Sequence, residues 1–163
     1  MSYQPYALAF PAPAFALSSK DFEAGGPLPT SAYQPTNESP ELSWGPLPAG
    51  TKSLVVTAFD ADAPIPGGLW HWALKDVPAT VSGLAHGSTG VGTAVTNDLG
   101  RPGYTGVQPP PGTGTHRLFI AVTALSVETL ELAEHASLAM LNIAMVPHAL
   151  GRAVLVGTST PAS

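Results

Sequence analysis

The sequence contains no cysteine, and only 10% of its 163 residues are charged. The absence of cysteine excludes disulfides, thiolate metal ligands and cysteine nucleophiles. Lysine and arginine number six against eleven aspartates and glutamates, so the net charge is −5 at pH 7. A surface for nucleic acid or anionic lipid needs clustered basic side chains, and the six here do not cluster. We therefore expect no nucleic-acid partner.

Long apolar runs are also missing. No stretch reaches the roughly eighteen uninterrupted apolar residues of a transmembrane helix, which predicts no stable membrane insertion. Residues 1–22 weakly resemble a signal peptide, but they lack a basic start, and Pro5, Pro11 and Pro13 interrupt the apolar run. We interpret residues 1–14 as an edge strand or extended arm and expect a cytoplasmic protein.

Proline and glycine, by contrast, are abundant, with eighteen and seventeen residues spread through the whole length. This excludes an architecture of long helices and favours short strands joined by many turns. A length of 163 residues fits a single domain, and no internal repeat divides it. Apolar runs bounded by turn residues predict strands over 53–59, 69–74, 90–95, 116–125 and 152–157.

One substantial helix is predicted near the C-terminus. Residues 137–150 have helical composition and spacing, and Pro147 should kink or shorten that helix. Turns and irregular connections are expected at 24–50, 76–84 and 96–115, and a frayed tail at 158–163. The sequence therefore predicts a mainly β, mostly antiparallel domain spanning residues 1–163.

An acidic corner follows the first of these strands. Asp60 and Asp62 are two residues apart, so in extended chain they point to the same side. In the next strand, strict alternation places Trp70 and Trp72 on one face and His71 on the other. If the two strands are neighbours, His71 can reach one of the carboxylates, which would orient the imidazole and favour its protonated form.

A second histidine, His116, begins a strand directly after the glycine- and proline-rich loop 104–115. Two histidines at strand ends, each beside a glycine-rich turn, indicate a small-ligand pocket. In that loop, residues 106–108 offer backbone N–H groups, whereas the prolines at 109–111 offer none and stiffen the wall. Free N–H groups beside imidazoles suit an oxyanion such as phosphate or carboxylate.

The two aspartates would repel such an anion. The conflict is resolved if the carboxylates hold the histidines cationic, or if they accept a proton from the ligand. A zwitterionic ligand also resolves it, with an ammonium group for the aspartates and a phosphate for the imidazoles.

Three motifs in order resemble the phosphatidylethanolamine-binding protein family, in its bacterial Raf-kinase-inhibitor-like branch. They are "DADAP" (60–64), "WHW" (70–72) and "YTGVQPPPGTGTHR" (104–117). Each motif alone is weak, but the three stand at fitting separations. The resemblance covers roughly residues 15–157.

The resemblance implies a β-sandwich with a small anion-binding cavity at one end. We expect no metal and no cofactor, because the histidine spacing lacks a helical H-x-x-x-H and the proposed N–H donors favour an anion. The resemblance implies a small anionic or phospho-containing ligand, such as a phospholipid head group, and modulation of a protein kinase or other signalling partner. It also suggests homodimers, as for bacterial members. Carried over by position, the ligand-binding residues are Asp60, Asp62, Trp70, His71, Tyr104, Gly106, Gln108, Pro109, Pro110 and His116.

The chain departs from the family pattern at three positions. Ala61 replaces a usual proline, which predicts a less rigidly held Asp60. Gln108 replaces a small residue and is expected to narrow the pocket. Leu118 replaces a common aromatic residue, so one wall should be less aromatic.

Two other classes of function stay open. In an enzyme, Asp60, His71 and His116 would serve as general acid and base of a hydrolase, or as a metal-ligand set. The sequence has no G-x-S-x-G motif and no serine beside a histidine, which favours a binding protein. A purely structural, self-associating domain is the third class. The histidines outside the motifs, read as surface or structural residues, are His86, His135 and His148.

Overall fold

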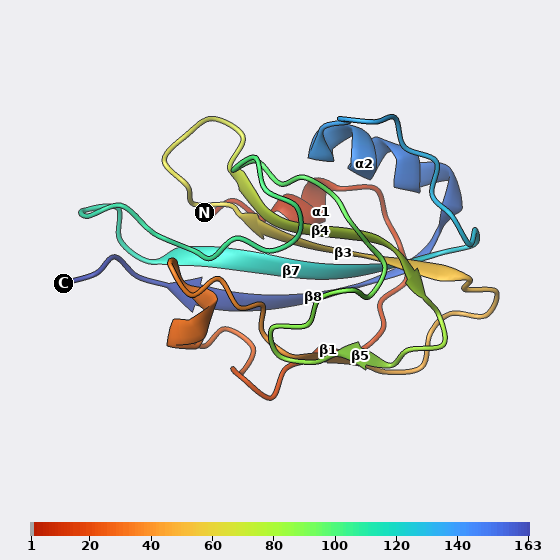
Figure 1. Ribbon diagram of the computed structural model, residues 1–163, viewed down its shortest axis with the longest axis horizontal. Helices are drawn as coiled ribbons and strands as arrows, with labels where there is room; N and C mark the ends of the chain where they lie inside the picture. Colours follow the sequence, from red (N-terminus) through yellow and green to blue (C-terminus); the bar gives the residue numbers. More distant parts are fainter. Residues whose placement is uncertain (1) are drawn as a thin grey trace.

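The computed structural model describes residues 2–163. Its centre is a five-stranded sheet in the order β6-β4-β3-β7-β8, beside a three-stranded sheet in the order β1-β2-β5 (Figure 1). Neighbouring strands in both sheets pair antiparallel, which confirms the predicted fold class. The strands are β1 Leu17–Ser18, β2 Leu42–Trp44, β3 Ser53–Asp60, β4 Leu69–Pro78, β5 Gly83–Leu84, β6 Thr93–Ala94, β7 His116–Leu125 and β8 Ala149–Ser159.

The large sheet is covered on both faces. Figure 1 shows the small sheet below it and helix α2 (Leu138–Met145) above it. Val56 packs in the core cluster on the small-sheet side, whereas its neighbour Val55 packs with Leu141 of the helix. Every residue of β3 is therefore buried, because alternate side chains enter two different cores.

Helix α2 is shorter than the predicted 137–150. Ser137 caps its N-terminus, since the Ser137 hydroxyl accepts a hydrogen bond from the Met140 N–H at 3.2 Å. The helix ends at Met145 and continues as the 3-10 turn η2 (Val146–His148), which contains Pro147. Proline lacks the N–H that a further helical turn needs, so the chain leaves the helix and enters β8.

Both chain ends are more ordered than expected. The segment predicted as an extended arm contains helix α1 (Pro5–Leu8), and Ala14 forms a β-bridge with Arg152. At the other end, Ser159 still belongs to β8 and pairs with His116 of β7. The prediction of a frayed tail from residue 158 therefore places the end of the strand too early. The ladder to β7 supplies the hydrogen bonds that keep these residues in the strand.

The remaining elements differ from prediction in length. Strand β4 continues to Pro78, and β5 forms within the segment expected to be a turn. The strand predicted over 90–95 is reduced to β6, and η1 (Thr30–Ala32) lies in the irregular segment 24–50. No helix among residues 2–163 has the length and apolar character to cross a membrane.

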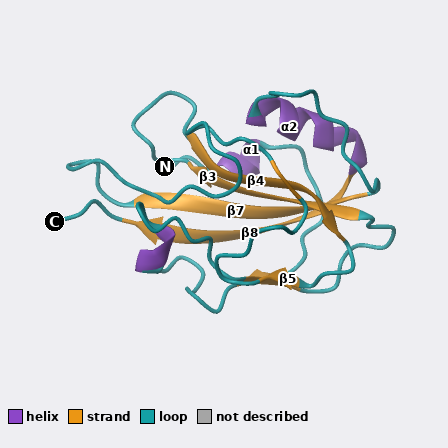
Figure 2. Cartoon of the chain, in the orientation of Figure 1, coloured by secondary structure: helices purple, strands orange, loops and turns teal. Residues whose placement is uncertain are grey.

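Several loops meet at one end of the large sheet. Figures 1 and 2 show the loop after β3, the loop before β7 and the C-terminus gathered there. The long connection 96–115 contains no helix or strand of its own, as expected. The Asn97 amide stabilises it by donating to the Gly103 carbonyl at 3.1 Å and to the Thr105 hydroxyl at 3.0 Å.

Candidate ligand-binding site

A cavity of about 270 Å³ opens at this end of the sheet. We call it the site cavity. Six of the ten predicted ligand-binding residues line it, and they come from the end of β3, the start of β4 and the loop that leads into β7. These six are Asp60, His71, Gln108, Pro109, Pro110 and His116. The structure thus brings together the three segments that the motifs marked.

Asp62 and Trp70 lie outside the site cavity. The Asp62 carboxylate accepts two hydrogen bonds from the Arg117 guanidinium, both at 2.8 Å, and one from the Arg117 N–H at 2.9 Å. The hydrogen bonds from Arg117 lower the pKa of Asp62. Trp70 stacks on Phe59, with 4.5 Å between ring centroids. Both residues therefore support the scaffold around the site.

Tyr104 and Gly106 also lie outside the site cavity. The Tyr104 hydroxyl donates to the Ala32 carbonyl at 2.7 Å, and its ring lines a different cavity beside Trp72. Burial raises the pKa of Tyr104 above its usual range. The Gly106 N–H donates to the Asn37 Oδ1 at 2.8 Å.

The expected set of free backbone donors is accordingly smaller. The Gly106 N–H is occupied by Asn37, and the Val107 N–H donates to the Ala32 carbonyl at 3.1 Å. Within residues 2–163, only the Gln108 N–H of the three has no hydrogen-bond acceptor. The loop before the three prolines therefore packs against residues 32–37, and it cannot cradle an anion with three amides.

A β-bulge orients His71. Ala58 pairs with Trp72 and Phe59 pairs with Trp70, so His71 is the extra residue on β4. As a result Trp72 packs in the cluster with Ala58, whereas Trp70 packs in the cluster on the opposite face. The predicted placement of both tryptophans on one face is wrong, because the bulge breaks the alternation. It also directs His71 into the site cavity.

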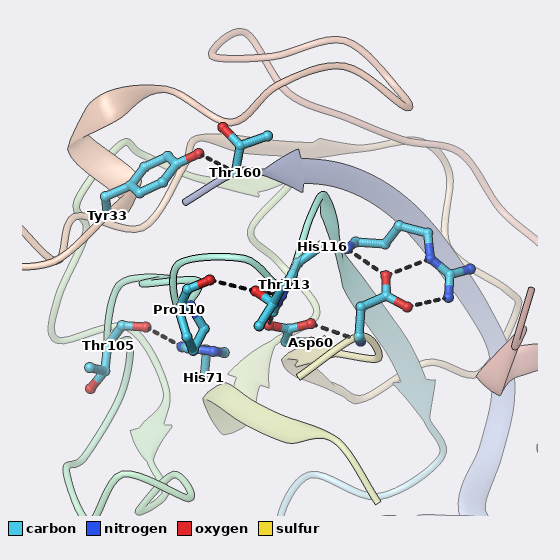
Figure 3. Close-up of polar contacts among 10 residues, drawn as sticks. Tyr33, Asp60, His71, Thr105, Pro110, Thr113, His116 and Thr160 are labelled. Carbon is cyan, nitrogen blue, oxygen red and sulfur yellow. Dashed lines mark hydrogen bonds and ion pairs between the residues drawn. The ribbon is translucent and has the colours of Figure 1, made fainter. Parts of the chain in front are cut away.

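His116 is the imidazole that pairs with the acidic corner. Its Nδ1 lies 2.8 Å from Asp60 Oδ2, and its Nε2 lies 2.8 Å from the Thr113 hydroxyl (Figure 3). The other Asp60 oxygen accepts the Asp62 N–H at 2.9 Å. Both carboxylate oxygens are thus held, although Ala61 stands where proline was expected.

His71 has no carboxylate partner. Its Nδ1 lies 2.9 Å from the Thr105 carbonyl, and its own carbonyl accepts the Thr105 N–H at 2.9 Å. Burial lowers the pKa of His71, and this outweighs the hydrogen bond to Thr105 and the charge of Asp60. The expectation that an aspartate charges this ring is wrong, because His116 and Arg117 occupy the two carboxylates.

Sequence reasoning missed the apolar part of the cavity wall and one polar contact. The additional lining residues are Gln34, Ala63, Pro64, Ile65, Leu69 and Leu99. Thr113, three residues before His116, contacts the ring through its hydroxyl. That short spacing within a tight Gly-x-Gly turn is the one signal that could have marked it. Leu118 is buried in the core cluster on the small-sheet side and does not line the site cavity, so its difference from the family pattern does not change the cavity wall.

No group of three or more histidines, aspartates or glutamates among residues 2–163 is placed to hold a metal ion. The site cavity has Asp60 and the two imidazoles as its only ionisable lining residues. The carboxamides of Gln34 and Gln108 are its other polar lining side chains, so its polar chemistry consists of hydrogen bonds from and to these five groups.

The sequence matches the family model described as phosphatidylethanolamine-binding protein over residues 18–160. Among relatives, the UPF0098 protein YbhB of Escherichia coli is 40% identical over 151 residues, covering 84% of this chain and 94% of that protein. The "Putative lipoprotein LppC" of Mycobacterium tuberculosis is 36% identical over 154 residues, covering 91% of this chain and 75% of that protein.

Solved structures have the same fold. Escherichia coli YbcL, described as a new member of the mammalian PEBP family, aligns with a TM-score of 0.83 at 30% identity, covering 91% of this chain and 99% of that one. A protein of Chlamydia trachomatis named as a homologue of the same family aligns with a TM-score of 0.83 at 31% identity, covering 93% and 100%.

Proposed function

Because the chain belongs to the phosphatidylethanolamine-binding protein family, we propose that it binds a small anionic or phospho-containing ligand in the site cavity and catalyses no reaction. The observation that carries this proposal is the convergence of His71, His116 and Asp60 on one open cavity. These three polar side chains are only 3%, 1% and 5% exposed, so most of their hydrogen-bonding capacity can serve only the protein or a ligand in that cavity.

The size and lining of the cavity favour a head group over a whole lipid. A volume of about 270 Å³ lies just below the usual range for drug-sized ligands, which is about 300–1,000 Å³. Ile65 and Leu99 are half-exposed and line the cavity beside the polar groups. A ligand with a compact polar end and an apolar remainder would match both the polar groups and the apolar residues of the cavity.

Calorimetric titration with inorganic phosphate and phosphoethanolamine tests the proposal. We expect His71→Ala to weaken binding by about 1.5–3 kcal/mol, the contribution of a hydrogen bond to a charged group. We expect His116→Ala to weaken binding by less, because the Thr113 hydroxyl already occupies His116 Nε2. His135→Ala is the matched control, because that side chain is 90% exposed. Unchanged affinity in both folded cavity variants would refute this location for the site.

A second candidate function is ester hydrolysis. One observation favours it: Asp60, His116 and Thr113 form a continuous chain of hydrogen bonds, the order of groups in a catalytic triad. It ranks second because the Thr113 hydroxyl also contacts the Pro110 carbonyl at 2.7 Å, and a carbonyl can only accept. The hydroxyl proton is therefore directed away from the imidazole. Turnover of p-nitrophenyl acetate that is lost in Thr113→Val would favour the enzyme.

We further propose modulation of a protein kinase, a homodimer and a cytoplasmic location. The half-exposed apolar residues Ile65 and Leu99 at the site cavity support a protein contact there. Kinase assays with added protein, light scattering and cell fractionation test the three proposals separately. The relative LppC is named as a lipoprotein, so recovery in the membrane fraction would overturn the third.

A further inference from the structure

We infer that the site cavity selects oxoacids that still carry a proton, such as hydrogen phosphate, over isosteric oxoanions without one, such as sulfate. The inference rests on the proposed function and specifies the chemistry of its ligand. It follows from counting protons at the two imidazoles.

His71 presents a hydrogen-bond acceptor to the site cavity. A carbonyl oxygen only accepts, so the contact between Nδ1 and the Thr105 carbonyl places the ring proton on Nδ1 (Figure 3). The ring lines the site cavity, and Nε2 has no hydrogen-bond partner among residues 2–163. This nitrogen is not fully buried, so it is open to the cavity. In the neutral ring this nitrogen carries a lone pair.

The His116–Asp60 pair supplies no net charge. The Thr113 hydroxyl has one proton and gives it to the Pro110 carbonyl, so Nε2 of His116 must donate to the Thr113 oxygen. One further proton lies between Nδ1 of His116 and Asp60 Oδ2. Whichever atom holds that proton, the imidazole and carboxyl together are electrically neutral.

No neighbouring carboxylate forms an ion pair with His71. Asp60 is paired with His116 and Asp62 with Arg117, whereas Asp98 accepts the Trp70 N–H at 2.9 Å. The charges of Asp60 and Asp98 raise the pKa of His71, but burial outweighs them. The ring is also withdrawn from water, which disfavours a second proton on it. An oxygen atom that approaches Nε2 must therefore bring its own hydrogen.

Hydrogen phosphate and protonated phosphomonoesters meet this requirement, because a P–OH group can donate to His71 Nε2. Sulfate has the same shape but only acceptor oxygens near neutral pH. A phosphodiester also lacks the hydroxyl, which separates a free monoester from the phosphate of an intact phospholipid. A buried acceptor left facing another acceptor is the kind of mismatch by which binding sites reject close analogues.

Calorimetry on the unmodified protein tests the inference. At pH 7 we expect sulfate to bind at least roughly tenfold more weakly than phosphate. Near about pH 6, close to the second pKa of a phosphomonoester, we expect methyl phosphate to bind more tightly than dimethyl phosphate. In His71→Gln the amide can present either N–H or C=O, so the discrimination should largely disappear. His135→Gln is the control and should retain it.

The outcomes separate the two proposals. Equal affinity for phosphate and sulfate, or for methyl and dimethyl phosphate, overturns the inference and leaves the proposed function standing. Absence of binding by every oxoanion overturns both. If His71→Gln does not fold, titration of the unmodified protein in buffers of different ionisation enthalpy gives the same answer. Sulfate has no proton to donate, so its binding must be accompanied by uptake of a proton from the buffer at His71, whereas phosphate binding must not. Equal proton uptake with the two ligands overturns the inference.

Discussion

Thr113 occupies the position on His116 that a ligand oxygen would need. Both ring nitrogens of His116 already have partners within the protein, Asp60 and the Thr113 hydroxyl. A ligand can reach the Nε2–H only if the Thr113 oxygen gives way. We therefore expect Thr113→Ala, which removes the hydroxyl and frees the space beside His116 Nε2, to bind phosphate more tightly than the unmodified protein.

The magnitude follows from the hydrogen bond that is exchanged. In the unmodified protein, phosphate replaces one oxygen by another at His116 Nε2, so this bond contributes little to affinity. In the variant, phosphate forms a bond that is otherwise unmade, and such a bond to a charged group contributes about 1.5–3 kcal/mol. Thr113 is partly exposed, so in the ligand-free variant water can supply part of the hydrogen bond that the His116 ring loses. We expect the lower end, about a tenfold gain in affinity.

The assay combines calorimetry with thermal unfolding, with and without phosphate. The ligand-free variant should unfold at lower temperature, because the buried ring loses a partner, and phosphate should stabilise it more than it stabilises the unmodified protein. Thr113→Ser keeps the hydroxyl and should behave as the unmodified protein. Equal or weaker phosphate binding by Thr113→Ala would refute the reasoning, since it would show that Thr113 either contacts the ligand or has no effect on its binding.

Two further predictions concern stability. His86 bridges Asp21 at 2.7 Å and Glu38 at 2.8 Å, and these two hydrogen bonds raise its pKa. The contribution of His86 to the free energy of unfolding should be complete below about pH 6.5 and lost as the pH rises through the raised pKa. Solvent screening limits this contribution to at most about 1 kcal/mol. The free energy of unfolding measured from pH 6 to 9 should therefore fall, and in His86→Gln the fall should be smaller. Gly106→Ala would place its Cβ 2.5 Å from the Tyr33 carbonyl carbon and 2.6 Å from the Gln34 nitrogen. We expect chemical denaturation to show a loss of about 1–3 kcal/mol, whereas Gly112→Ala, where the Cβ meets no atom within 4 Å, should lose less despite its φ of +81°.

Much of the sheet could be predicted from local pattern. The strand over 116–125 is observed with the predicted bounds, because ten consecutive residues suit a strand buried on both faces. The meeting of His71 and His116 was also predictable, because the motifs place each at the end of a strand that pairs with β3.

The partners of the site residues could not be predicted in this way. Whether Asp60 binds His71 or His116 depends on the order β4-β3-β7 and on the bulge at His71, and no single segment encodes either. The Asn37 side chain that occupies the Gly106 N–H lies 69 residues away in the chain. Contacts between such distant segments are set by tertiary packing, which composition and periodicity do not report.

The residues of the site stand on two kinds of backbone, the strands of the large sheet and the loops that connect them. Asp60 and His116 belong to adjacent strands of a ladder buried on both sides, so their spacing is as rigid as the sheet itself. Ile65 and Leu99 stand on connecting loops, where exchanges disturb little of the core. Proteins built this way can acquire new ligand preferences by altering the loop-borne apolar wall, while the acid–imidazole pair beneath it stays in place.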